Sequence, residues 1–233
     1  MKYRQAILVA AIASWTYSFG CHLKDLNQDG AVRIAFVGDS TSVLFPQNEW
    51  IGYPYLVKEM MRQRYFFYDV TIHAEIGATV CAGFPYYNFH VLLTDALADQ
   101  HPDAVVLAGG TNDAVRQVPV DTYMTNMYVL FTRITQANAL PIAALTPRLV
   151  GPAASEYPWA NGLIDQYNAQ LRAQLPRTQL VDLDRVVSDV ADGAHFGPGA
   201  QLSRAGVAFE ELTDDALPPS VDPWALLAEL AAH

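Results

Sequence analysis

Short apolar runs alternate with amphipathic segments from Val32 onward, and this alternation constrains the fold more than any other feature of the chain. Apolar runs bounded by turn residues predict buried strands at 32–37, 68–74, 104–108, 141–145 and 180–183. Apolar residues at helical spacing predict helices at about 52–64 and 89–98, from Asp121 to about 137, at about 163–175, and from Ser203 to about 212. Strands that alternate with helices form right-handed βαβ units. We therefore expect an α/β fold in which about five parallel strands form one sheet between two helical layers.

The composition fits one main folded domain, which we place at 31–215. The chain has 233 residues, of which 52% are hydrophobic and 16% are charged, so it can bury a large core. Pro218 and Pro219 break the chain after this domain, and residues 216–233 are expected to form a tail helix packed on it. The formal net charge of −10 argues against a nucleic-acid partner, because phosphate binding needs a basic face. The sequence gives no indication of the oligomeric state.

The first 20 residues have the layout of a secretory signal. Lys2 and Arg4 precede a brief apolar run, and that run is too short for a stable membrane span. Two cleavage points remain open: after the A-x-A sequence 11–13, or before Cys21 as in a bacterial lipoprotein signal. We expect a secreted or periplasmic protein, with lipid anchoring through Cys21 as the alternative.

The two cysteines, Cys21 and Cys81, leave two interpretations open. In an exported protein they can form one disulfide, or Cys81 can be a buried and unreactive thiol. No C-x-x-C sequence and no cysteine–histidine cluster indicates a metal site.

The sequence DLNQDG, residues 25–30, resembles the start of an EF-hand calcium loop. The twelfth position of such a loop would be Phe36, where a bidentate glutamate is required, and Phe36 falls within the first predicted strand. We therefore interpret DLNQDG as a turn that leads into the strand, and we expect no metal ion there.

Polar segments follow most of the predicted strands. In an open parallel sheet the active site lies beyond the carboxyl ends of the strands, so these segments are expected to meet on one rim. They are GDS at 38–40, the glycine of EIGATVCAG at 77, GGTND at 109–113 and DGAHF at 192–196.

The residue types on this rim suit acyl transfer. The hydroxyl of Ser40 is a nucleophile once a base removes its proton, and His195 titrates near neutrality and can be that base. Asp192 lies three residues before His195, where a turn can bring its carboxylate to the imidazole. The backbone N–H groups of Ser40 and Gly77 and the side-chain amide of Asn112 are candidate donors for an oxyanion.

Each of these residues also has a purely structural interpretation. Ser40 can be a turn residue, Asn112 can cap a helix, and Asp192 with Gly193 can form a turn. His195 can be an exposed loop histidine. Only the joint occurrence of the four segments in this order favours catalysis.

VGDSTS, the glycine of IGATVCAG, GGTND and DGAHF resemble the four ordered blocks of the SGNH, or GDSL-type, hydrolases, and the resemblance spans about 32–212. It implies a flavodoxin-like three-layer fold and a cofactor-free serine hydrolase. It also implies Ser40 as nucleophile, His195 as base with Asp192 as its partner, and an oxyanion hole formed by Ser40, Gly77 and Asn112. The chain departs from the family pattern where Thr41 replaces the usual leucine or isoleucine.

The expected activity is hydrolysis of short-chain, acetyl esters through an acyl-enzyme, with a small-molecule or polysaccharide ester as substrate. Aromatic residues at 84–89 and 156–162 can line a pocket for a sugar ring or an acyl chain, or can simply pack on the sheet. A lipase-like or thioesterase-like enzyme, an acyltransferase, and a non-catalytic binding protein on the same fold remain alternatives.

Overall fold

The computed structural model of the chain is described for residues 23–42, 52–65, 67–83, 88–185 and 198–213. Its centre is a five-stranded sheet in which every pairing is parallel and the strand order is β2-β1-β3-β4-β5. The strands are β1 (Val32–Gly38), β2 (Tyr68–Ala74), β3 (Ala104–Ala108), β4 (Leu140–Ala144) and β5 (Leu180–Val181). The predicted α/β fold is confirmed.

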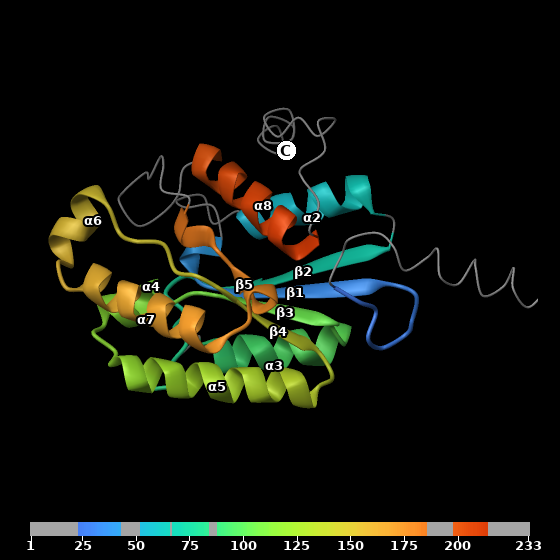
Figure 1. Ribbon diagram of the computed structural model, residues 1–233, viewed down its shortest axis with the longest axis horizontal. Coiled ribbons are helices and arrows are strands. Elements are labelled where there is room, and N and C mark those ends of the chain that lie inside the picture. The colour runs from blue at the N-terminus through green and yellow to red at the C-terminus, as the bar shows by residue number, and fades with distance from the viewer. Residues whose placement is uncertain (1–22, 43–51, 66, 84–87, 186–197, 214–233) are drawn as a thin grey trace, which may run out of the picture.

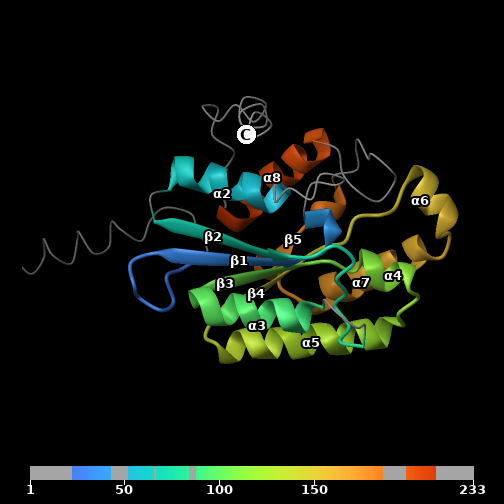
Figure 2. The ribbon, with the colours of Figure 1, turned by 180° about the vertical axis from the view of Figure 1, so that it is seen from behind.

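Helices cover both faces of this sheet, which gives three layers (Figure 1). One face carries α2 (Tyr53–Arg64) and α8 (Pro198–Thr213). The opposite face carries α3 (Phe89–Gln100), α5 (Val120–Gln136) and α7 (Ala160–Gln174), as Figure 2 shows from behind. Shorter elements lie in the connections: α4 (Thr111–Val115), α6 (Gly151–Glu156), η1 (Ser40–Ser42), η2 (Arg177–Gln179) and η3 (Leu183–Arg185).

The side chains of β1 point alternately to the two faces of the sheet, and they contribute to a separate core cluster on each face. Ile34 and Phe36 pack in the cluster beneath α2 and α8, whereas Ala35 and Val37 pack in the cluster beneath α3, α5 and α7. All five residues of β3 are buried, as expected for a strand covered on both sides. Among the described residues, no helix combines the length and the apolar character that crossing a bilayer requires.

Two predicted helix starts are wrong. The helix placed at Asp121 begins at Val120, with Pro119 at the N-cap, so Asp121 lies in the first turn, where its negative charge suits the helix dipole. The helix placed at Ser203 begins at Pro198, because proline is compatible with a first helical turn. Strand β5 is also shorter than predicted, since the chain turns into η3 at Leu183.

The DLNQDG segment forms a turn, as predicted. Its side chains accept hydrogen bonds from its own backbone: Asp25 from Gly30 N–H (2.9 Å), and Asn27 from Asp29 N–H (3.0 Å). Phe36 is fully buried within β1 and cannot supply the twelfth calcium ligand. Within the described parts of the chain, no cluster of three or more His, Cys, Asp or Glu side chains is arranged to hold a metal ion.

The predicted signal at 1–20, Cys21 and the predicted tail helix at 216–233 lie outside the described residues. Cys81 is a free thiol and is buried.

Asp103 attaches the segment before β1 to the sheet. It lies between α3 and β3, is 2% exposed, and its carboxylate accepts hydrogen bonds from the backbone N–H groups of Leu26 (2.6 Å), Asn27 (3.1 Å) and Arg33 (2.8 Å). The Asp103 backbone N–H donates to the carbonyl of Arg33 (2.8 Å). One carboxylate therefore satisfies two amides of the segment before β1 and one amide of β1 itself.

We expect Asp103→Ala to lower the free energy of unfolding by about 2–4 kcal/mol, because it leaves partly buried amides without a charged acceptor. Asp103→Asn keeps one acceptor oxygen and should lose less. The measurement is urea unfolding followed by circular dichroism, with the exposed Asp121→Ala as the control. This control loses only a favourable contact with the helix dipole, so a change of less than about 1 kcal/mol is expected. Equal stability of Asp103→Ala and the wild type would contradict this role.

Candidate active site

The turn that carries Ser40 is held by the side chain of Asp39. Strand β1 ends at Gly38, and Ser40 opens the short helical turn η1 with 6% of its surface exposed. The fully buried Asp39 carboxylate accepts hydrogen bonds from the Thr41 backbone N–H (2.9 Å) and the Thr41 hydroxyl (2.7 Å). Thr41, where the family pattern has leucine or isoleucine, therefore binds the turn through a hydroxyl that an aliphatic residue lacks.

Gly38 is required by the close approach of this turn to β1. A Cβ atom at position 38 would lie 2.3 Å from the Ser42 Oγ and 2.7 Å from the Ser42 Cβ, distances that van der Waals contact forbids. The glycine thus allows η1 to fold directly over the end of the strand.

Asn112 joins three of the predicted segments. It lies in α4, which follows β3, and its side-chain Nδ2 donates to the carbonyl of Ala78 at 2.9 Å. The same nitrogen lies 3.5 Å from the Asp39 Oδ2. Gly77, which precedes Ala78, has a φ of +80°, in the region that favours glycine. The segments of Ser40, Gly77 and Asn112 therefore converge at one place, and Asn112 does not cap a helix.

The two glycines before α4 are needed for close packing. A Cβ at Gly109 would lie 2.4 Å from the ring of Phe89, and Gly110 has a φ of +128°. The Gly109 carbonyl accepts hydrogen bonds from the hydroxyls of Thr146 (2.8 Å) and Tyr123 (3.3 Å). The hydroxyls of Thr146, which follows β4, and of Tyr123 in α5 thus hold the backbone that leads into Asn112.

Asp113 fixes the loop after β2 rather than taking part in chemistry. Its fully buried carboxylate accepts hydrogen bonds from the backbone N–H groups of Val80 (2.9 Å) and Cys81 (3.1 Å). Burial raises the pKa of Asp113, and these hydrogen bonds oppose that rise. Burial, followed by the nearby Asp113 carboxylate, raises the pKa of the Cys81 thiol to about 12, so this cysteine is an unreactive thiol near neutral pH.

Helix α8 contributes two polar residues beneath the Ser40 turn. The Gln201 side chain donates to the Thr41 carbonyl (3.5 Å) and accepts from the Tyr53 backbone N–H (2.9 Å), so it links η1 to the start of α2. Arg204 is fully buried, and burial lowers the pKa of its guanidinium to about 9, while the nearby Tyr53, Asp39 and Asp184 oppose that fall. Arg204 is thus a buried positive charge close to the Asp39 carboxylate.

Sequence reasoning missed Gln201 and Arg204, although a signal was present. Both lie on the stripe of α8 that also contains Ala205, Ala208 and Phe209, and all five are buried. Polar residues on the apolar stripe of a core helix need buried partners, and such residues are candidates for supporting a site.

The other two predicted site residues, Asp192 and His195, fall at 186–197 and lie outside the described residues. Their assignment as orienting acid and general base stays a prediction. Helix α8 begins at Pro198, and Gln201 in its first turn donates to the Thr41 carbonyl, so the start of α8 lies beside the turn that carries Ser40.

The sequence model of the GDSL-like lipase/acylhydrolase family matches residues 36–209, about three quarters of the chain. The chain belongs to this family. It is accordingly an esterase/lipase-type enzyme, a carboxylic ester hydrolase, as the ordered sequence blocks predicted. No curated protein matches the chain.

Solved structures of similar fold agree with the family assignment. The crystal structure of TesA is 22% identical, with a TM-score of 0.59, over 78% of this chain and 98% of that one. A lipase/acylhydrolase from Enterococcus faecalis is 21% identical, with a TM-score of 0.59, over 78% of this chain and 96% of that one. The psychrotrophic esterase EstA from Pseudoalteromonas sp., in a structure inhibited by monoethylphosphonate, is 18% identical, with a TM-score of 0.57, over 78% of this chain and 97% of that one.

We expect Gly38→Ala to reduce kcat/KM for p-nitrophenyl acetate by about 100-fold. The added methyl group displaces η1, and a small displacement is enough to disturb the alignment of the Ser40 hydroxyl with an ester carbonyl. The double variant Gly38→Ala/Ser42→Gly removes both clashing atoms and should recover most of the activity. Gly206→Ala, where a Cβ meets nothing within 4 Å, is the matched control and should keep full activity. Wild-type activity in Gly38→Ala would contradict the tight fit of this turn.

Proposed function

We propose that this enzyme hydrolyses short-chain, acetyl esters through a Ser40–His195–Asp192 triad and an acyl-enzyme intermediate. The observation that carries the proposal is the position of Asn112. Its amide lies between the Asp39 carboxylate and the Ala78 carbonyl, and so joins the segments of the proposed nucleophile and the proposed oxyanion glycine. That juxtaposition is the arrangement acyl transfer needs, since donors must face the carbonyl that the nucleophile attacks.

In the proposed first step, His195 takes the proton of the Ser40 hydroxyl as its Oγ attacks the ester carbonyl, and Asp192 stabilises the resulting imidazolium. His195 then passes the proton to the leaving alcohol, and the acyl group stays on Ser40. Water, deprotonated by His195, attacks the acyl-enzyme, and the acid is released as His195 returns the proton to the Ser40 oxygen.

The proposed oxyanion donors are the backbone N–H groups of Ser40 and Gly77 and the side-chain amide of Asn112. One Asn112 N–H is committed to the Ala78 carbonyl at 2.9 Å, which fixes the plane of the amide. Its other contact, with Asp39 at 3.5 Å, is weak. We propose that this second N–H donates to the oxyanion, where one donor contributes about 3 kcal/mol to the transition state.

An exposed tryptophan, packed against a half-buried tyrosine, supports a carbohydrate ester as substrate. The Trp159 indole N–H donates to the carbonyl of Val115 (3.2 Å), the last residue of α4, and the ring remains 41% exposed. Tyr157 packs against it edge to face, with 5.9 Å between ring centroids. Val115 lies about one helical turn from Asn112. This anchored aromatic surface is therefore close to the proposed site, and such surfaces suit the flat faces of sugar rings.

Ser40→Ala should keep the fold and lower p-nitrophenyl acetate turnover by at least about 1,000-fold, because the proposed acyl-enzyme forms on the Ser40 hydroxyl. It should also abolish labelling by a fluorophosphonate probe, a reaction class suggested by the monoethylphosphonate-inhibited EstA. Ser155→Ala, on the exposed surface of α6, is the control and should be unaffected. Undiminished turnover in Ser40→Ala would exclude Ser40 as nucleophile, and absence of labelling in the wild type would favour a non-catalytic binding protein.

Trp159→Ala should lower kcat/KM for acetylated xylo-oligosaccharides by about tenfold, since a ring stacked on the indole loses its contact area. Turnover of p-nitrophenyl acetate should change by less than about twofold. Tyr128→Ala, an exposed aromatic residue on α5, is the matched control. Equal losses on both substrates would contradict a sugar-binding role.

The acyl chain length and the acceptor distinguish the other candidate activities. A rate optimum at acyl chains of eight carbons or longer would favour a lipase-like or thioesterase-like enzyme. Transfer of the acyl group to an added alcohol in preference to water would favour an acyltransferase.

A further inference from the structure

Strand β2 forms one edge of the sheet, and its outer side has no neighbouring strand among the described residues. An edge strand presents backbone N–H and C=O groups that can pair with another strand. Strand β2 spans seven residues, is regular, and contains no proline or glycine to interrupt pairing. Its outer side is therefore a candidate interaction surface.

The direction of each backbone group follows from two hydrogen bonds at the ends of β2. The Phe67 carbonyl accepts from Val32 N–H (2.7 Å), and the Glu75 N–H donates to the Gly38 carbonyl (3.2 Å), so residues 67 and 75 face β1. Directions alternate along a strand, which places the odd-numbered residues of β2 toward β1. The N–H and C=O groups of the even-numbered residues 68, 70, 72 and 74 therefore point outward.

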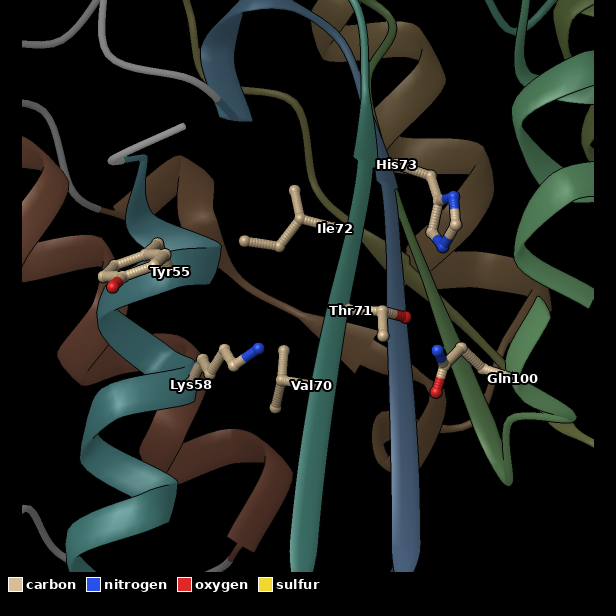
Figure 3. A pocket seen from close by; sticks show the side chains of 7 residues that line it. All are labelled: Tyr55, Lys58, Val70, Thr71, Ile72, His73 and Gln100. Carbon is tan, nitrogen blue, oxygen red and sulfur yellow. The ribbon is translucent and has the colours of Figure 1, made fainter. Parts of the chain in front are cut away.

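A groove of about 310 Å³ runs along this outer side, as Figure 3 shows. Its floor is β2 from Val70 to His73. Tyr55 and Lys58 of α2 stand on one side with Val70 and Ile72, and Gln100 of α3 stands on the other with Thr71 and His73. The groove thus follows the open edge between two helical walls, which is the shape an added strand requires.

We propose that β2 pairs with β2 of a second copy of this chain, in an antiparallel arrangement whose two-fold axis passes beside Thr71. In this register Val70 lies opposite Ile72 of the second copy, and both are residues whose backbone groups point outward. Each such pair exchanges two backbone hydrogen bonds. The two five-stranded sheets then continue into each other across the axis.

The side chains that lie opposite each other favour this register over its neighbours. A two-fold axis beside Thr71 places Asp69 opposite His73 of the second copy, and the symmetry creates the same pair twice. Moving the axis to Ile72 would instead set Asp69 opposite Glu75, which is a like-charge pair. Moving it to Val70 would set His73 opposite the exposed Phe67. Like charges directly opposite each other across two strands destabilise a sheet, whereas an imidazole N–H can donate a hydrogen bond to a carboxylate that lies opposite it.

The long side chains at the rim are compatible with this pairing. Lys58 lies on the α2 side of the groove, on the other face from Asp69 and His73. Its flexible stem can lie along the wall while its ammonium group remains in water.

Cysteine cross-linking of the full chain tests the register. Thr71→Cys, in a Cys21→Ser background, places two thiols opposite each other in a pair that is not hydrogen-bonded, with Cα atoms about 4.5 Å apart, within the range of a disulfide. Asp69→Cys is the matched control on the same face of the same strand. Its two copies would lie four residues out of step, about 13 Å apart. Under mild oxidation we expect Thr71→Cys to form covalent dimer at least ten times faster than Asp69→Cys.

Sedimentation equilibrium of the full chain tests the association itself. We expect a reversible monomer–dimer equilibrium with a Kd below about 100 µM for the wild type. Asp69→Lys, which faces His73 of the second copy, should raise this Kd at least tenfold. Asp121→Lys makes the same charge change on α5 and should leave the Kd within about twofold. Thermal melting by circular dichroism confirms that each variant is folded.

Three results would overturn the proposal: a wild-type chain that stays monomeric at about 100 µM, cross-linking of Asp69→Cys as fast as Thr71→Cys, or equal effects of Asp69→Lys and Asp121→Lys. A dimer with either of the last two results would use another surface or another register. A strictly monomeric chain would leave the edge of β2 to a different occupant or to water.

Discussion

The candidate site depends on the parallel pairing of β1 with β2 on one side and with β3 on the other. This pairing continues beyond the strands: the Glu75 N–H donates to the Gly38 carbonyl, and the Asp39 N–H donates to the Ala108 carbonyl (3.4 Å). The chain segments that leave the three strands therefore start from fixed, adjacent positions. Parallel strands end at the same edge of the sheet. The segments that carry Ser40, Gly77 and Asn112 therefore meet at this edge, although they are far apart in the sequence.

The second requirement is that the buried Asp39 carboxylate at this edge is satisfied inside the protein. The buried Asp39 carboxylate would cost several kcal/mol without partners, yet it accepts two hydrogen bonds from Thr41 and lies near the Asn112 amide. The buried guanidinium of Arg204 supplies the opposite charge from α8. A preorganised site of this kind resists rearrangement, because moving any one member leaves another unpaired.

Strand β2 has a different role on each of its two sides. Its inner backbone groups pair with β1 and set the start of the loop that carries Gly77. Its outer groups face the groove between α2 and α3, and Asp69, Thr71 and His73 share one face of the strand. Association through this edge would extend the sheet without covering the carboxyl ends of the strands, so we expect it to leave the rim of the proposed site open.

The sequence by itself determined the α/β class, the positions of the strands and the family. Runs of apolar residues report burial, and the order of the GDS, GGTND and DGAHF blocks is read directly from the chain. It misplaced the starts of α5 and α8, because Pro119 and Pro198 can open a helix as well as a polar cap can. Only the tertiary structure decided the roles of Asp103, Gln201 and Arg204. Gln201 binds Tyr53 across 148 residues of sequence, and local pattern carries no information about a hydrogen-bond partner at that distance.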